Sequence, residues 1–132
     1  MDRVVIGVHL HLWNTERLRH EWLQRPENAA INRPFGFEDF RARAAAAGVD
    51  RAVLVQADDS AAGTEAMFEV AAAHPEIAGV VAWVPLDRPD DAAARLRARP
   101  GFAGIRTLIH DQPDPDWLLT PGGGRRAGAA GA

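Results

Sequence analysis

Apolar residues along the chain gather in four short runs, at residues 3–8, 51–57, 78–84 and 102–109. Each run is nearly continuous rather than alternating, which is typical of strands covered on both faces. Helical signals lie between the runs, at residues 37–47, 64–73 and 90–99, and Gly48 is a C-terminal stop signal for the first of these. Strands that alternate with helices predict parallel βα units and therefore an α/β fold.

Residues 9–35 interrupt this alternation. The segment contains Trp13, Trp22 and Phe35 but no clean period, so it predicts a long loop. Long loops inside compact domains are usually functional or disordered. The aromatic residues argue against disorder, since they fold onto other parts of a protein. We therefore expect this loop to cover the mouth of a site.

Two histidines, His9 and His11, stand where the first apolar run ends. Residues two apart in a strand point to the same side, so both imidazoles can reach one point at the carboxyl end of the strand. A divalent metal ion needs such nitrogens, roughly 2 Å from a common centre. The pair predicts a metal-binding or catalytic site, and an incidental pair of half-buried histidines is the alternative.

The segment Val8-His-Leu-His-Leu-Trp-Asn14 resembles the opening of the amidohydrolase-related hydrolases. Within that family it is similar to the lactonase-like branch, which includes fuconolactonase-like and pyrone-dicarboxylate-lactonase-like enzymes. Gly7 and Asn14 stand where the branch usually has aspartates. Further matches follow in order at residues 22–23, 48–56, 79–86, 104–111 and 113–119. The resemblance thus covers residues 3 to 119.

This resemblance implies a (β/α)₈ TIM-type barrel, an architecture of roughly 250 residues or more, with the site at the carboxyl ends of the strands. The chain has 132 residues and four strand-like runs. We therefore expect residues 1–119 to form the first four βα units, the N-terminal half of a truncated barrel. Residues 120–132 contain only Thr, Pro, Gly, Ala and Arg, and predict a disordered tail. That tail is either an ordinary flexible terminus or a segment read out of frame.

The resemblance also implies hydrolysis of a lactone or a similar carboxylate-bearing ring, ester or amide. It assigns catalytic roles to His9 and His11. His110 is a further catalytic candidate, which either forms an orienting pair with Asp111 or caps a loop. A zinc or manganese ion on His9 and His11 fits this chemistry, and so does metal-free hydrolysis, because some members of the branch work without a metal. A later-strand histidine and a strand-eight aspartate have no counterpart in this sequence. We therefore expect impaired activity from this chain.

Three further residues are candidates for substrate binding: Gln56, Arg106 and Trp13. The planar guanidinium of Arg106 can clamp a carboxylate, or it can serve as a buried ion-pair partner. Gln56 either binds substrate or satisfies backbone groups. His20 and His74 are interpreted as structural or solvated, Trp83 as packing, and Asp58-Asp59-Ser60 as a helix N-cap rather than a metal site.

Two other functions stay open. The chain is either this hydrolase or a non-catalytic half-barrel that binds metal or a partner chain, and phosphoesterases with a His-x-His start form a third class. A half-barrel leaves two open sheet edges, which favours self-association.

The composition of the chain limits which classes of partner molecule are expected. Hydrophobic residues make up 47% and charged residues 25% of the chain, as in ordinary globular proteins. The net charge of -3 is too small to indicate a nucleic-acid or membrane-surface partner, so a small-molecule substrate is expected. The absence of cysteine excludes disulfides and thiolate ligands. Neither a secretion signal nor an apolar stretch of about 18 residues is evident, so we expect a cytoplasmic protein.

Overall fold

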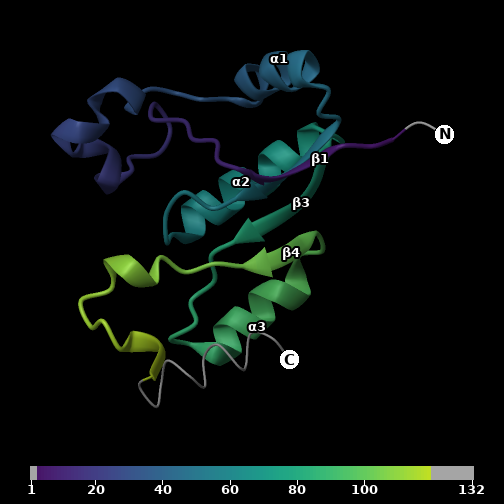
Figure 1. The fold of residues 1–132 in the computed structure, drawn as a ribbon. Helices are drawn as coiled ribbons and strands as arrows, with labels where there is room; N and C mark the ends of the chain where they lie inside the picture. Colours follow the sequence, from purple (N-terminus) through teal and green to yellow (C-terminus); the bar gives the residue numbers. More distant parts are fainter. Residues whose placement is uncertain (1–2, 120–132) are drawn as a thin grey trace.

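The computed structural model describes residues 3–119, and the expected tail at 120–132 lies outside the described residues. One parallel sheet has the order β1-β2-β3-β4. Helices connect consecutive strands (Figure 1). The predicted parallel α/β fold is therefore confirmed. The elements are β1 (Ile6–Leu10), α1 (Phe37–Ala47), β2 (Arg51–Val55), α2 (Ala61–Ala73), β3 (Ile77–Ala82), α3 (Pro89–Ala98) and β4 (Phe102–Ile105).

Helix boundaries follow from local capping. α1 occupies the residues predicted for it, because Gly48 ends it in the left-handed conformation, with φ of 70°. α2 begins three residues before the predicted Thr64, since the Ser60 hydroxyl accepts a hydrogen bond from the Gly63 amide at 2.9 Å. The N-cap prediction for Asp58-Asp59-Ser60 therefore holds for Ser60 alone.

All four strands differ from their predicted limits, since β2 ends two residues before residue 57 and β3 two before residue 84, but β1 and β4 differ most. β1 starts at Ile6, not at residue 3, and continues through His9 to Leu10. β4 ends at Ile105, whereas the apolar run predicts a strand to residue 109. The reason is that the Leu108 amide donates to the Asp59 carboxylate at 3.0 Å, and a short 3-10 helix, Ile109–Asp111, follows. A side chain thus replaces the neighbouring strand as the partner of this backbone.

The predicted loop at residues 9–35 is wrong in one respect, because it contains two short 3-10 helices, Glu21–Gln24 and Pro26–Ile31. An antiparallel bridge between Trp13 and Phe35 closes the segment. The Trp13 ring packs edge-on against Trp22 and Phe35, with centroids 5.3 and 5.2 Å away. Short 3-10 turns held by aromatic contacts have no sequence period, which explains why the pattern did not predict them.

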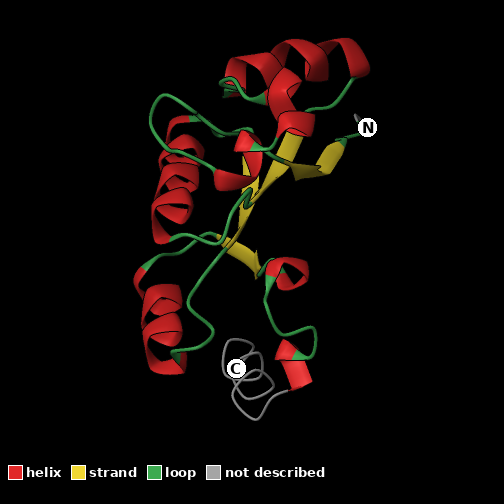
Figure 2. Ribbon diagram, turned by 90° about the vertical axis from the view of Figure 1, so that its left-hand side faces the viewer, coloured by secondary structure: helices red, strands yellow, loops and turns green. Residues whose placement is uncertain are grey.

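The core lies between the sheet and its helices, and α2 and α3 cover the same side of the sheet (Figure 2). Leu54 and Val80 from the strands meet Met67 and Phe68 from α2 there. Leu10 and Leu12 also pack against this cluster. Because neighbours in a strand alternate in direction, His9 and His11 face the opposite side of the sheet.

The edges of the sheet are poorly covered. Within residues 3–119, β1 and β4 each pair along one edge only. On and before β1, Val4, Val5, Ile6 and Val8 are exposed to 61%, 40%, 44% and 73%.

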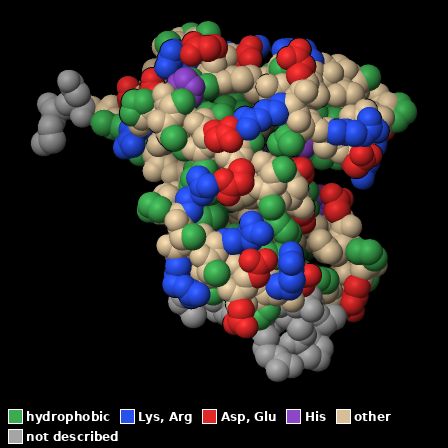
Figure 3. Space-filling model, turned by 180° about the vertical axis from the view of Figure 1, so that it is seen from behind, with side chains coloured by type: hydrophobic (Ala, Val, Ile, Leu, Met, Phe, Trp, Pro, Cys, Tyr) green, Lys and Arg blue, Asp and Glu red, His purple; other side chains and the backbone are tan. Residues whose placement is uncertain are grey.

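The side of the molecule covered by the helices is seen in Figure 3, where positive and negative side chains are interspersed over its surface. Within residues 3–119, no helix has the length and apolar character needed to cross a membrane.

Candidate functional site

His9 and His11 converge at the carboxyl end of β1. Their Nε2 atoms lie 2.9 Å apart, and the rings meet edge-on. Nδ1 of His11 lies 2.9 Å from the backbone oxygen of Val55 at the end of β2. A carbonyl oxygen only accepts hydrogen bonds, so Nδ1 carries the proton and Nε2 presents a lone pair. In this tautomer, Nε2 can ligate a metal ion or accept a proton.

The environment keeps His11 neutral. Burial lowers the pKa of His11 below its ordinary value of 6.5, and the nearby His9 and Arg106 lower this pKa further. The hydrogen bond to the Val55 carbonyl opposes the shift but does not reverse it. A neutral imidazole keeps its Nε2 lone pair at neutral pH, which suits a base or a metal ligand.

A hydrogen-bond network ties the end of β2 to the end of β4. Gln56 is buried, and its side-chain amide donates to Asp59 Oδ1 at 2.9 Å and to the Arg106 carbonyl at 3.2 Å. The Asp59 carboxylate also accepts from the Leu108 amide at 3.0 and 3.1 Å. Burial raises the pKa of Asp59, while the Leu108 amide opposes that rise. This network fixes the turn that carries Arg106.

The same region contains a cavity of about 330 Å³. It brings together His11, Trp13, Gln56, Arg106 and His110 among the residues singled out by sequence. His9 does not line the cavity and lies behind His11. Sequence reasoning missed Trp22 and Arg25, which line it from the 9–35 segment. The family match at residues 22–23 was a signal for Trp22, whereas neither a periodic pattern nor a motif marks Arg25.

The candidate side chains differ in how they are held. The Trp13 indole donates to the Arg33 and Ile31 carbonyls, at 2.9 and 3.3 Å, so this residue also organises the loop. His110 is 67% exposed and lies 3.7 Å from the Asp111 carboxylate, beyond hydrogen-bond distance.

Polar atoms around the cavity are left without partners. Arg106 Nη1, Gln56 Oε1 and Trp22 Nε1 are buried, and none has a hydrogen bond within the described part of the chain. Buried polar groups are normally hydrogen-bonded, and leaving one unpaired is costly. The walls of the cavity therefore hold two unpaired donors and one unpaired acceptor, each closed off from solvent.

The donor set fits a metal ion only in part. The two Nε2 atoms are the kind of ligand that zinc prefers. The hydrogen bond from His11 Nδ1 to the Val55 carbonyl orients one of them. Within residues 3–119, however, no group of three or more His, Cys, Asp and Glu side chains could hold a metal. His9 and His11 therefore form an incomplete ligand set.

Comparisons with known proteins agree with this geometry. The family model described as Amidohydrolase matches residues 6–129. The chain belongs to the amidohydrolase family. An L-fucono-1,5-lactonase of Burkholderia ambifaria is 35% identical over 119 residues, which cover 88% of this chain and 40% of that enzyme. The chain thus spans less than half the length of this curated relative.

Solved structures show the same fold. An amidohydrolase from Burkholderia multivorans with bound zinc superposes with a TM-score of 0.81 at 21% identity, covering 94% of this chain and 44% of that one. A probable 2-pyrone-4,6-dicarboxylic acid hydrolase from Acinetobacter baumannii, with citric acid bound, gives 0.69 at 20% identity, covering 97% and 46%. The four-stranded sheet therefore matches part of an amidohydrolase barrel, as expected.

The pKa of His11 makes a testable prediction. Because the folded-state pKa lies below the unfolded value of 6.5, the unfolded chain binds more protons between these two values. The unfolding free energy should therefore rise with pH across that window and be lost as the pH falls through it. Urea unfolding at a series of pH values measures this, and His11→Asn should flatten the rise. His110→Asn is the matched control, and a rise that survives in His11→Asn would contradict the prediction.

Proposed function

We propose that the site around His9 and His11 hydrolyses a lactone or a similar carboxylate-bearing ring, ester or amide. The observation that carries this proposal is the shared cavity, which places the neutral His11 beside the unpaired Arg106 Nη1. A volume of about 330 Å³ suits a single-ring substrate. The family membership and the lactonase relative support the same reaction class.

The reacting water would bind between the two histidines. His9 Nε2 carries the hydrogen toward His11, and this direct hydrogen bond occupies one donor and one acceptor until the rings separate. A water that separates the rings can accept from His9 and donate to His11 Nε2. His11 then receives the proton as the water oxygen attacks the carbonyl carbon.

Arg106 and Gln56 would orient the substrate. Arg106 brings a positive charge and an unpaired buried donor, which match a carboxylate. The Gln56 carbonyl oxygen is buried and unpaired, so it can accept from a substrate hydroxyl. Trp13 and His110 complete the walls of the cavity.

A zinc or manganese ion on His9 and His11 would supply Lewis-acid activation of the water. Metal-free hydrolysis would use the same two histidines differently, because an Nε2 atom that ligates a metal cannot also accept the proton of the water.

The role of Arg106 predicts a substrate-dependent effect. Arg106→Met should raise KM for 2-pyrone-4,6-dicarboxylate by about 10- to 100-fold, the cost of a lost hydrogen bond to a charged group. KM for the uncharged L-fucono-1,5-lactone should stay the same. Arg51→Met, an exposed cation at the opposite end of β2, is the matched control. Equal effects on both substrates would show that Arg106 does not bind the carboxylate.

Two groups that the resemblance implies, a later histidine and a late aspartate, have no counterpart here. The loss of a group that assists His11 in proton transfer commonly costs about 10²- to 10⁴-fold in rate. The 132-residue chain should therefore hydrolyse L-fucono-1,5-lactone roughly 10²- to 10⁴-fold more slowly than the Burkholderia ambifaria lactonase. His11→Ala should remove the remaining turnover. Turnover equal to that of the complete lactonase would disprove the impairment.

A second candidate function is that of a non-catalytic half-barrel that associates with another chain. The observation favouring it is the apolar surface of Val4, Val5, Ile6 and Val8 beside the free edge of β1. Unpaired edges with apolar side chains recruit further strands. Sedimentation should show dimers or larger species, and Val8→Lys should shift them toward monomer. A monodisperse monomer with a sharp unfolding transition would reject this candidate.

A further inference from the structure

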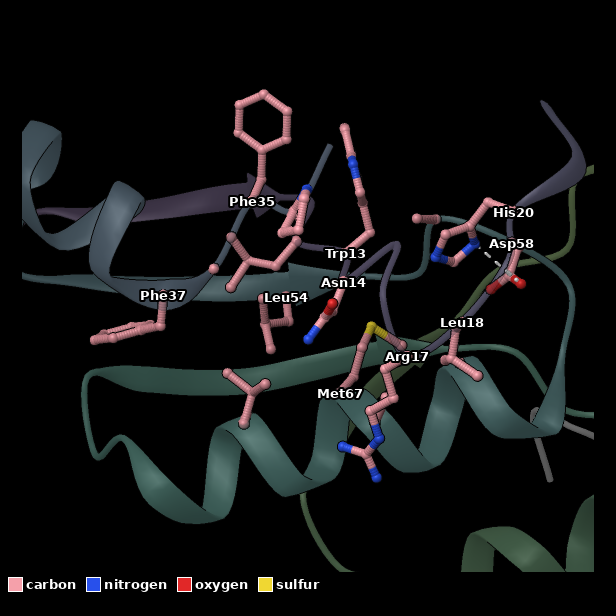
Figure 4. Close-up of a pocket in the computed structure, with 17 residues that line it drawn as sticks. Trp13, Asn14, Arg17, Leu18, His20, Phe35, Phe37, Leu54, Asp58 and Met67 are labelled. Carbon is pink, nitrogen blue, oxygen red and sulfur yellow. Dashed lines mark ion pairs between the residues drawn. The ribbon is translucent and has the colours of Figure 1, made fainter. Parts of the chain in front are cut away.

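A second cavity, of about 200 Å³, lies between the 9–35 segment and α2 (Figure 4). Its walls are mostly apolar, and Met67 lies at their centre in this view. It shares only Trp13 and Ala57 with the cavity around His11, so the two are neighbours divided by these residues. The proposed hydrolysis makes no use of it.

A buried histidine and a carboxylate stand at one end of this second cavity. His20 is 4% exposed, and its Nδ1 lies 3.3 Å from Asp58 Oδ2. The Ser60 hydroxyl donates to the same carboxylate oxygen at 3.0 Å. Gly63 leaves the space that the carboxylate fills, because a Cβ there would clash with Asp58 Oδ1. The carboxylate is thus held firmly, and within the described residues the imidazole lies against it without a hydrogen bond at Nδ1.

The Asp58 contact decides what His20 can bind. A lone pair on Nδ1 would face the negative carboxylate only 3.3 Å away, so the ring proton belongs on Nδ1 and Nε2 presents a lone pair. Within residues 3–119, no hydrogen bond to Nε2 of His20 is formed. Figure 4 shows the ring with one edge toward Asp58 and the other toward the side of Trp13 and Asn14. A ligand in this cavity therefore meets mostly apolar walls and the Nε2 acceptor of His20, and the polar residues Asn14, Arg17 and Asp58 also line the cavity.

We propose that this cavity is a binding site for a small aromatic alcohol of the phenol class. The ring occupies the apolar part beside Met67, and the hydroxyl donates to Nε2 of His20. The volume is suitable, since a dry apolar cavity of roughly 150 Å³ is enough to hold benzene. The site is independent of the hydrolytic residues, because neither His20 nor Asp58 lines the cavity around His11.

The test uses the two methionines of the chain, Met1 and Met67. With ¹³C-methyl methionine labelling, titration of the complete 132-residue chain with 4-methylphenol should shift the Met67 signal and leave Met1 unchanged. Toluene has the same ring without the hydroxyl, so it should bind about two- to tenfold more weakly, as expected for one lost hydrogen bond. No shift of Met67, or equal affinity for the two probes, would overturn the proposal. Tighter binding of benzoate than of 4-methylphenol would also overturn it, by identifying an anion site.

Variants then separate the polar and apolar parts. Ala66→Leu fills the cavity and should abolish binding of both probes, whereas Ala72→Leu, an exposed position on the same helix, should retain it. His20→Leu should remove the difference between 4-methylphenol and toluene. If His20→Leu does not fold, the two-probe comparison on the unsubstituted chain still decides the role of the hydroxyl.

Discussion

The Asp59 carboxylate joins the ends of two strands that do not pair with each other. β3 lies between β2 and β4, yet Asp59 accepts from Gln56 beside β2 and from Leu108 beyond β4. The turn that carries Arg106 is thereby fixed relative to β2, where the Val55 carbonyl orients His11. The position of the guanidinium relative to the histidines depends on this bridge together with the backbone hydrogen bond from Arg106 to Ala82. Without it, the backbone after Ile105 would lack its side-chain partner, and the cavity would lose one wall.

Burial makes this bridge rigid and also sets the chemistry around it. The half-buried surroundings that disfavour a charge on His11 also raise the pKa of Asp59. A neutral base and a buried acceptor network thus have one physical cause, the removal of water from the ends of the strands. The two cavities on either side of Trp13 differ in what they offer. One presents an unpaired guanidinium donor, and the other presents an imidazole acceptor against an apolar wall.

Local patterns predicted the fold well because each strand and helix carries its own signal. The apolar runs located all four strands, and Gly48 located the end of α1. The His-x-His spacing indicated convergent imidazoles, which follows from strand geometry alone. Asp59 could not be found this way, since its partner Leu108 is 49 residues distant and contributes only a backbone amide. His20 and Asp58 are likewise 38 positions apart, and the intervening segment gives no period that would bring them together. Contacts of this kind depend on packing, which no single window of sequence contains.

The sequential strand order has a consequence for local stability. Each strand pairs only with its neighbours along the chain, so the sheet is close to a one-dimensional stack of repeated units. β2 and β3 have partners on both sides, whereas β1 and β4 have one each. Units at the ends of such a stack open more readily than those in the middle, and their amides exchange hydrogen sooner. The histidine pair therefore sits on an element that can fray without unfolding the centre. A second chain that pairs with β1 would slow this fraying and order the two imidazoles at the same time.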